Sequence, residues 1–237
     1  WFPADANIKI TAQPKGGYRF RRWDGDAAGT FTQAFVAMGG PRTIVALLEK
    51  VPFIAPAGVR NAAGETPEGA VAPGSIISIL GESLAPHFEE GRVNPLPQAI
   101  ADTTVRVGSS LLPLVFVSPT EIRAQVLSIL PEGEHTLTVK WEGHPEISAN
   151  FRVARNAPGL FAKSGETEPI ASATHADGTP VTREEPALPG EIVTVFGTGF
   201  GPYDKVVIDG FLVTSSGYSV VDPIQVAAGD FQVTPET

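Results

Sequence analysis

Hydrophobic and polar residues alternate in short runs along most of the chain, and this period of two predicts β-strands. The clearest run is residues 135–141, in which Leu137, Val139 and Trp141 alternate with polar residues. Gly and Pro clusters separate the runs, as expected where tight turns join short strands. Further strands are predicted at residues 8–12, 18–23, 31–38, 43–48, 76–80, 103–107, 111–117, 121–126 and 147–153. The pattern therefore predicts an all-β protein.

One stretch of the chain occurs twice. Residues 73–86 and residues 189–202 share Pro, Gly, Ile, Gly and Pro at the same places. Each copy is a Pro-Gly turn, then a run of β-branched and large apolar residues, then a Gly that ends the strand. Such a repeat indicates two related β units in tandem.

The spacing of the strands suggests how the chain is divided. About seven short strands with regular turn signals are typical of a two-sheet sandwich, and residues 73–156 fit this pattern. Residues 157–237 repeat it, about one or two strands short. Residues 1–50 form a small β module, and the Pro-, Gly- and Ala-rich residues 51–72 are a connector. The units at both ends are expected to be incomplete.

Composition narrows the classes of function. The 237 residues contain no Cys, which excludes disulfides, thiolate metal sites and a Cys nucleophile. The net charge of −9 divides into +3 for residues 1–50 and −12 for the remainder. An acidic body argues against nucleic acid as a partner. The longest apolar run, residues 111–117, is interrupted by Pro113 and is too short to span a bilayer, so no membrane insertion is expected.

No stretch carries a recognisable catalytic motif. Residues 197–202 superficially resemble a dinucleotide-binding loop, but no helix pattern follows them. The acidic pairs at 89–90 and 184–185 are predicted to lie in loops, and the four His residues, at 87, 135, 144 and 175, share no metal-ligand spacing. We therefore expect no enzymatic activity, no cofactor and no assigned metal ligands. A structural Ca²⁺ between domains, held by Asp24 and Asp26 or by Asp204 and Asp209, stays an open alternative.

Aromatic residues give the candidate binding positions. Tyr18, Phe20 and Trp23 are close together in one predicted strand, and Trp141 ends another. Two interpretations of the first group stay open: a platform on which a ligand stacks, and the core of a domain too small to have much else. Tyr18, Trp23 and Trp141 are the candidate ligand-stacking residues.

Residues 1–50 resemble the divergent internalin-type B-repeat of bacterial surface proteins. The resemblance is carried by residues 8–14 (IKITAQP), 17–20 (GYRF), 23–26 (WDGD), Met38 and 43–46 (TIVA). It implies a small β-grasp-like fold that acts as a spacer or an adhesive module. The usual opening strand of the repeat is missing here.

Residues 72–85 resemble the opening of a TIG-type (IPT) immunoglobulin-like domain. Residues 112–126, 156–161 and 197–202 together are similar to an uncharacterised C-terminal module of large secreted proteins of acidobacteria such as Solibacter relatives. This resemblance runs from about residue 61 to 210 and implies an exported β protein. The predicted fold class is therefore all-β, with a small β-grasp-like N-terminal module followed by two immunoglobulin-like β-sandwiches in tandem.

These observations predict a non-enzymatic structural or adhesive protein, secreted or on the cell surface. Sheets that lack a strand expose unpaired backbone groups, which favours pairing with another chain. One form of the hypothesis is a filament in which a terminal strand of one subunit completes a sheet of the next. Its candidate contact residues are Ile8, Ile10, Phe231 and Val233. Two alternatives remain: a stalk that binds a glycan or another ligand, and an accessory region of a large secreted enzyme.

Overall fold

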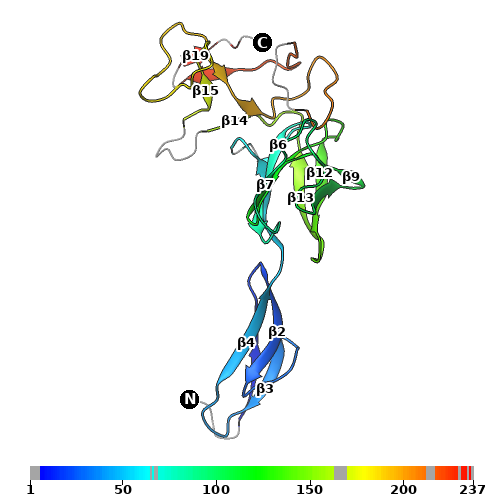
Figure 1. Cartoon of the computed structure of the whole chain (residues 1–237). Coiled ribbons are helices and arrows are strands. Elements are labelled where there is room, and N and C mark those ends of the chain that lie inside the picture. Colours follow the sequence, from blue (N-terminus) through cyan, green and yellow to red (C-terminus); the bar gives the residue numbers. More distant parts are fainter. Residues whose placement is uncertain are drawn as a thin grey trace.

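The computed structural model describes residues 6–64, 66, 69–162, 170–211, 217–228, 231–233 and 235. This part of the chain contains no α-helix and consists of antiparallel strands, so the predicted all-β fold is confirmed. The chain is elongated: an N-terminal module, a central sandwich and a C-terminal unit follow one another, with the two termini at opposite ends (Figure 1).

The N-terminal module is built from two antiparallel strand pairs. Strand β1 (Asn7–Thr11) pairs with β3 (Gln33–Ala37), and β2 (Tyr18–Gly25) pairs with β4 (Ile44–Lys50). The β2–β4 register shifts between Phe20 and Arg22. This extra residue places Phe20 and Trp23 in the same small core, where their ring centroids are 5.1 Å apart.

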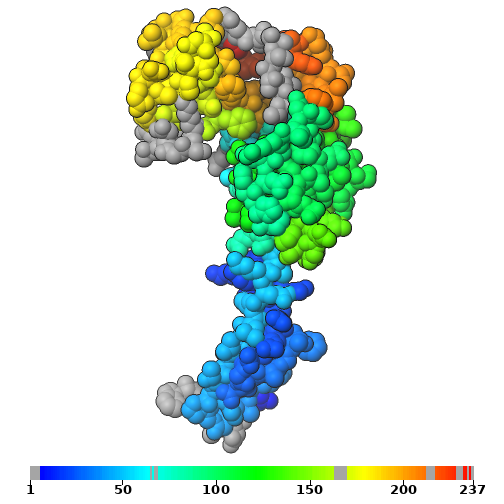
Figure 2. Space-filling model, viewed as in Figure 1, coloured from blue at the N-terminus to red at the C-terminus, as the bar shows by residue number. Residues whose placement is uncertain are grey.

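The module joins the sandwich through nearly continuous strand. Only Val51 and Pro52 separate β4 from β5 (Phe53–Asn61), which pairs with β6 (Ile76–Glu82) of the sandwich. The Phe53 ring lies so close to Gly16 that a Cβ at Gly16 would be 2.5 Å from it. Figure 2 shows the chain narrowing at this joint. The predicted connector, residues 51–72, thus contains a nine-residue strand. Its buried residues include Ile54, Val59 and Asn61, and its pairing with β6 shifts register between Ile54 and Val59.

Two sheets form the central sandwich. The first has the order β5-β6-β11-β10-β7 and the second β13-β12-β8-β9. The remaining bounds are β7 (Glu89–Glu90), β8 (Thr103–Val107), β9 (Ser110–Leu111), β10 (Leu114–Val117), β11 (Glu121–Gln125), β12 (Gly133–Trp141) and β13 (Ile147–Val153). One predicted strand, residues 111–117, is divided at Pro113, and its two parts lie in different sheets. Pro cannot donate a ladder hydrogen bond, so it stands where the chain crosses between the sheets.

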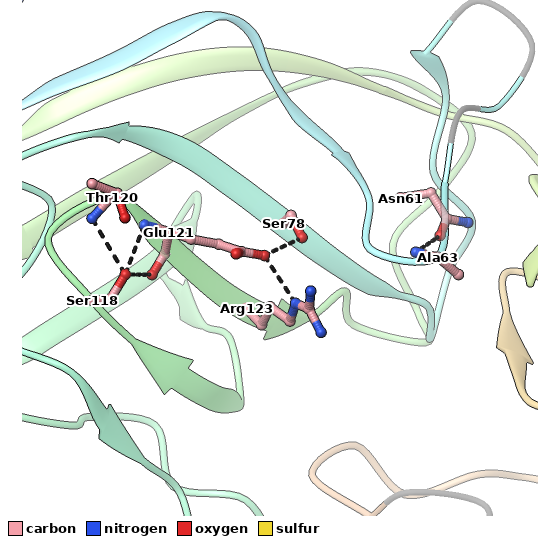
Figure 3. A network of polar contacts seen from close by, with 7 residues as sticks. All are labelled: Asn61, Ala63, Ser78, Ser118, Thr120, Glu121 and Arg123. Atoms are coloured by element: carbon pink, nitrogen blue, oxygen red, sulfur yellow. Dashed lines mark hydrogen bonds and ion pairs between the residues drawn. The ribbon is translucent and has the colours of Figure 1, made fainter. Parts of the chain in front are cut away.

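The sandwich contains the largest buried core of the described residues. Ile77 and Ile79 of β6 face Leu137 and Val139 of β12 across the two layers, and all four are buried. On the outer face of the first sheet, Glu121 Oε1 accepts hydrogen bonds from Ser78 Oγ at 2.7 Å and Arg123 Nε at 2.9 Å (Figure 3). The apolar positions of these strands therefore form the core, although the polar Ser78 and Thr138 between them are also buried.

The C-terminal unit has much shorter strands. Its antiparallel pairs are β14 (Gly159–Leu160) with β17 (Gly197–Thr198), β15 (Ala173–Thr174) with β16 (Thr194–Val195), and β18 (Val226–Ala228) with β19 (Phe231–Val233). The second copy of the repeated stretch is thus interrupted at Phe196, whereas the first copy forms the continuous strand β6. Val195 is exposed, unlike its counterpart Ile79 in the first copy. Among the described residues, this unit is a set of short ladders and not a closed sandwich.

Candidate functional site: an aromatic cleft beside the sandwich

A cleft of about 760 Å³ lies where the C-terminal unit meets the end of the sandwich. The sandwich contributes the start of β6 and the chain after β11, and the C-terminal unit contributes residues 196–207. Four aromatic residues line the cleft: Phe161, Phe196, Phe200 and Tyr203. Its wall is therefore made by segments far apart in sequence.

Buried hydrogen bonds hold the two units together beside the cleft. Asn61 Nδ2 donates to the Ala157 carbonyl at 2.6 Å, and Ala157 N–H donates to the Gly199 carbonyl at 2.9 Å. Thr198 Oγ1 accepts from the Ile76 N–H at 2.9 Å. Asn61 and Thr198 are both buried, so these bonds are shielded from water. We call Asn61, Ala157, Thr198 and Gly199 the clasp.

Gly199 is required at its position in the clasp. Its φ is +84°, in the left-handed region that disfavours residues with a side chain. A Cβ at this residue would lie 2.1 Å from the Ala157 carbonyl oxygen, which is far inside van der Waals contact. The glycine therefore permits both the backbone conformation and the close approach of the two segments.

A second contact neutralises charge at the rim of the cleft. The Arg155 guanidinium donates two hydrogen bonds to the Asp222 carboxylate, at 2.8 and 3.0 Å. This pairing, with an additional hydrogen bond from Asn156, holds the pKa of Asp222 below its usual value. Lys205 Nζ donates to the Gly217 carbonyl and lies 5.9 Å from the centroid of the Tyr218 ring. Both cations that line the cleft thus have partners within the chain.

Two further side chains shape the polar part of the wall. Gln125 accepts a hydrogen bond from the Gly210 N–H at 2.6 Å and so connects β11 to the C-terminal unit. Burial raises the pKa of the Tyr203 hydroxyl, because removal from water disfavours the charged phenolate. The cleft can therefore offer neutral hydrogen-bonding groups beside aromatic rings, an arrangement that suits binding of a small molecule.

The predicted stacking residues do not lie together. Trp23 is 8% exposed in the module core, and its Nε1–H donates to the Phe31 carbonyl, so its ring has no face for a ligand. Tyr18 is exposed and lies at the joint end of β2. Trp141 is half-buried, donates to the Ser83 carbonyl, and stacks on His144 with a 3.4 Å centroid separation. Of the two open interpretations, the structure therefore favours core packing for Trp23.

The predicted strand-contact residues lie on strands with open edges. Ile8 and Ile10 belong to β1, which pairs only with β3 among the described strands. Ile10 packs against the module core. Phe231 and Val233 belong to β19, whose described partner is β18, and Val233 is exposed. The contacts themselves stay a prediction.

The four Asp residues considered for Ca²⁺ are used as acceptors of backbone hydrogen bonds. Asp24 and Asp26 accept from Gly25 and Thr43, and Asp204 and Asp209 accept from Ser219 and Ser128. Within the described ranges, no group of three or more His, Cys, Asp or Glu is placed to hold a metal ion. No helix there is long and apolar enough to cross a membrane.

Sequence reasoning missed the cleft. From sequence, residues 197–202 give only the glycine that ends a strand and part of a family resemblance, although this segment supplies Phe200 to the wall and Gly199 to the clasp. The available signal was the pairing of two glycine-containing motifs: Gly159 and Leu160 pair with Thr198 and Gly197. The aromatic residues gave no sequence signal for the cleft, because their side chains come together only when these two segments pair.

Comparison with solved structures finds SGBP-B of the mixed-linkage glucan utilization locus of Bacteroides ovatus, in complex with a mixed-linkage heptasaccharide. The identity is 12%, the TM-score is 0.27, and the match covers 80% of this chain and 62% of that one. A TM-score this low does not establish a shared fold. No curated protein matches the chain.

Comparison with protein families gives one match, to the divergent InlB B-repeat domain, over residues 3–52. These residues end at the two-residue link before β5 and include all four strands of the module. The family match therefore confirms the resemblance predicted for residues 1–50: the N-terminal module is similar to a divergent InlB B-repeat.

Proposed function

We propose that the chain is a non-enzymatic structural and adhesive protein of the bacterial cell surface, in which units joined in series hold the cleft away from that surface. The observation that carries this proposal is the joint between β4 and β5, where only Val51 and Pro52 lie outside the strands and the Val51 N–H still donates to the Gly17 carbonyl. A long flexible linker would let the units move independently, whereas a two-residue link between paired strands restricts them. The B-repeat match supports a spacer role for the module.

The chemistry of the cleft supports binding without catalysis. Among the described residues that line the cleft, the only carboxylate is Glu132. Hydrolysis of a glycosidic bond ordinarily needs two carboxyl groups that face each other across the substrate. We therefore assign the cleft a binding role.

Small-angle X-ray scattering tests the spacer role. We expect the native chain to give an elongated particle with one narrow distribution of lengths. A Gly-Ser insertion between Val51 and Pro52 should broaden that distribution. The same insertion in the loop at Gly143, within the β12–β13 turn, is the matched control and should leave it unchanged. A native chain as heterogeneous as the joint variant would contradict the proposal.

Open strand edges favour a second candidate, a filament in which strands pair between subunits. Strand β1 has one edge without a partner among the described strands, and such an edge can accept another strand. Lys9→Pro removes a backbone donor from the open edge of this strand, because the even-numbered residues of β1 are the ones that hydrogen-bond β3, and it should reduce assembly. Light scattering at high protein concentration measures the assembly of the chain. A native chain that stays monomeric would exclude the filament.

We also propose that residues 61–210 are related to TIG-type domains and to the acidobacterial C-terminal module. The pairing of β14 with β17, which joins two of the motifs that carry this resemblance, supports it. Localisation outside the cell follows from the same proposal.

A further inference from the structure

We propose that the aromatic cleft is a binding site for a neutral oligosaccharide. The inference rests on the proposed adhesive role. It adds the class of ligand that is bound and the place in the fold where it binds. Three properties of the cleft lead to it: its size, its aromatic wall, and the internal pairing of its charges.

The size suits a short oligosaccharide. Sites for small molecules typically enclose about 300–1,000 Å³, and this cleft has about 760 Å³. It is formed by two units held by the buried bonds of the clasp, and not by one loop. The site is therefore largely formed before a ligand arrives, which reduces the entropy lost on binding.

The wall presents rings that a sugar can stack on. Phe196 lines the cleft with 46% of its surface exposed, although a side chain of this size is usually buried. Phe161, Phe200 and Tyr203 line it and are half-buried. The face of an aromatic ring is electron-rich and attracts the weakly positive C–H groups on one side of a pyranose.

The internal pairing of the charges favours a neutral ligand over an ionic one. Arg155 is bound to Asp222 through two hydrogen bonds, and Lys205 is bound to the Gly217 carbonyl. An anionic ligand would have to compete with these partners for the two cations, so it would gain little from ion pairing at this exposed rim. The remaining charged residue of the wall, Glu132, also lies near Arg155. A ligand without charge does not have to compete with the internal partners of these charged groups.

Hydroxyl groups remain to bind a polar ligand. Ser128 and Tyr203 line the cleft, and within the described part of the chain their hydroxyls hydrogen-bond no other group. A hydroxyl both donates and accepts, which matches the hydroxyls of a sugar. Aromatic faces beside neutral hydroxyls therefore favour a saccharide over a purely apolar molecule.

Isothermal titration calorimetry of the full chain tests the site. The neutral probes are cellotetraose, xylotetraose, mannotetraose, maltotetraose and chitotetraose, and the charged probe is tetragalacturonate. We expect at least one neutral probe to bind saturably and the charged probe to bind at least about tenfold more weakly. Phe196→Ala should weaken binding about tenfold, since a stacked ring is worth about 1 kcal/mol or slightly more. Tyr203→Phe keeps the ring and should weaken binding less.

The matched control is Phe88→Ala, which removes an exposed ring packed on Phe116 and outside the cleft. Affinity should not change in this variant. No binding by any neutral probe, tighter binding of the charged probe, or equal effects of Phe88→Ala and Phe196→Ala would each overturn the inference. The scattering experiment at the joint does not depend on any saccharide, so failure of the ligand site and failure of the spacer role are distinguishable.

Discussion

Replacing Gly199 by Ala should detach the C-terminal unit from the sandwich. The change adds one methyl group, in a region where the backbone has φ of +84° and the Ala157 carbonyl oxygen would lie 2.1 Å from the new Cβ. The segment containing Ala157 must therefore move. Its movement breaks the bond from the Ala157 N–H to the Gly199 carbonyl and the bond from Asn61 to the Ala157 carbonyl.

The expected loss in the free energy of unfolding has two parts. The left-handed backbone conformation costs a non-glycine residue about 1–2 kcal/mol. The two hydrogen bonds add about 2–4 kcal/mol, because Asn61 is buried and would be left without its acceptor. The total is about 3–6 kcal/mol, a large fraction of the stability of a typical domain.

Gly190 provides a control with the same backbone conformation. Its φ is also +84°, but no atom lies within 4 Å of the position that a Cβ would take. Gly190→Ala should therefore lower the free energy of unfolding only by the cost of the left-handed backbone conformation, about 1–2 kcal/mol. Urea denaturation followed by circular dichroism gives the free energy of unfolding, and hydrogen exchange at the Ala157 amide locates the change. Equal losses in the two variants would refute the steric argument for Gly199.

Three further changes test the core, the outer face and the C-terminal unit. Leu137→Ala removes a fully buried side chain and should cost about 2–5 kcal/mol, measured by urea denaturation. Glu121→Ala leaves the Ser78 hydroxyl, in a residue 4% exposed, without its acceptor, and should cost about 1–3 kcal/mol in the same assay. The hydrogen bond to Glu191 raises the pKa of His175, so its stabilisation should be complete below about pH 6.5 and lost as pH rises through the folded-state pKa. Nuclear magnetic resonance titration of the His175 ring measures that pKa directly.

Each of these changes has its own control. Leu188→Ala removes an exposed Leu and should change stability by less than about 0.5 kcal/mol. Removing Ser78 and Glu121 together should cost less than the sum of the two single changes, because no unpaired hydroxyl remains. In Glu191→Gln the pKa of His175 should fall towards its usual value, and a pKa that stays raised would show that another group sets it.

The sequence predicted the strands best where burial is one-sided. Residues 135–141 alternate because β12 has one face on the core, and β12 spans Gly133–Trp141. The segment containing Pro113 was harder, because a continuous apolar run does not reveal that its two ends belong to different sheets. Strand β5 was missed because Pro56 and the glycines around it resemble a linker, and its pairing partner β6 decides the outcome.

The cleft could not be predicted because local patterns say little about which segments meet. The second copy of the repeated stretch has nearly the same pattern as the first, yet Val195 is exposed where its counterpart Ile79 is buried. The difference arises from the partners: β6 lies between two long strands, whereas β16 and β17 each pair over two residues. The aromatic residue of this copy, Phe196, is thus exposed and lines the cleft.

The path of the chain through strand β5 determines how the molecule would respond to a pulling force. A force on the N-terminal module enters the sandwich at Phe53, which pairs with Glu82. It leaves at the opposite end of β5, where Asn61 pairs with Ile77 and holds Ala157. The force therefore runs parallel to β5 and stretches the β5–β6 hydrogen bonds together in shear instead of opening them one after another. Resistance to forced unfolding is set by the unfolding rate, and a shear geometry keeps that rate low while the chain is under tension.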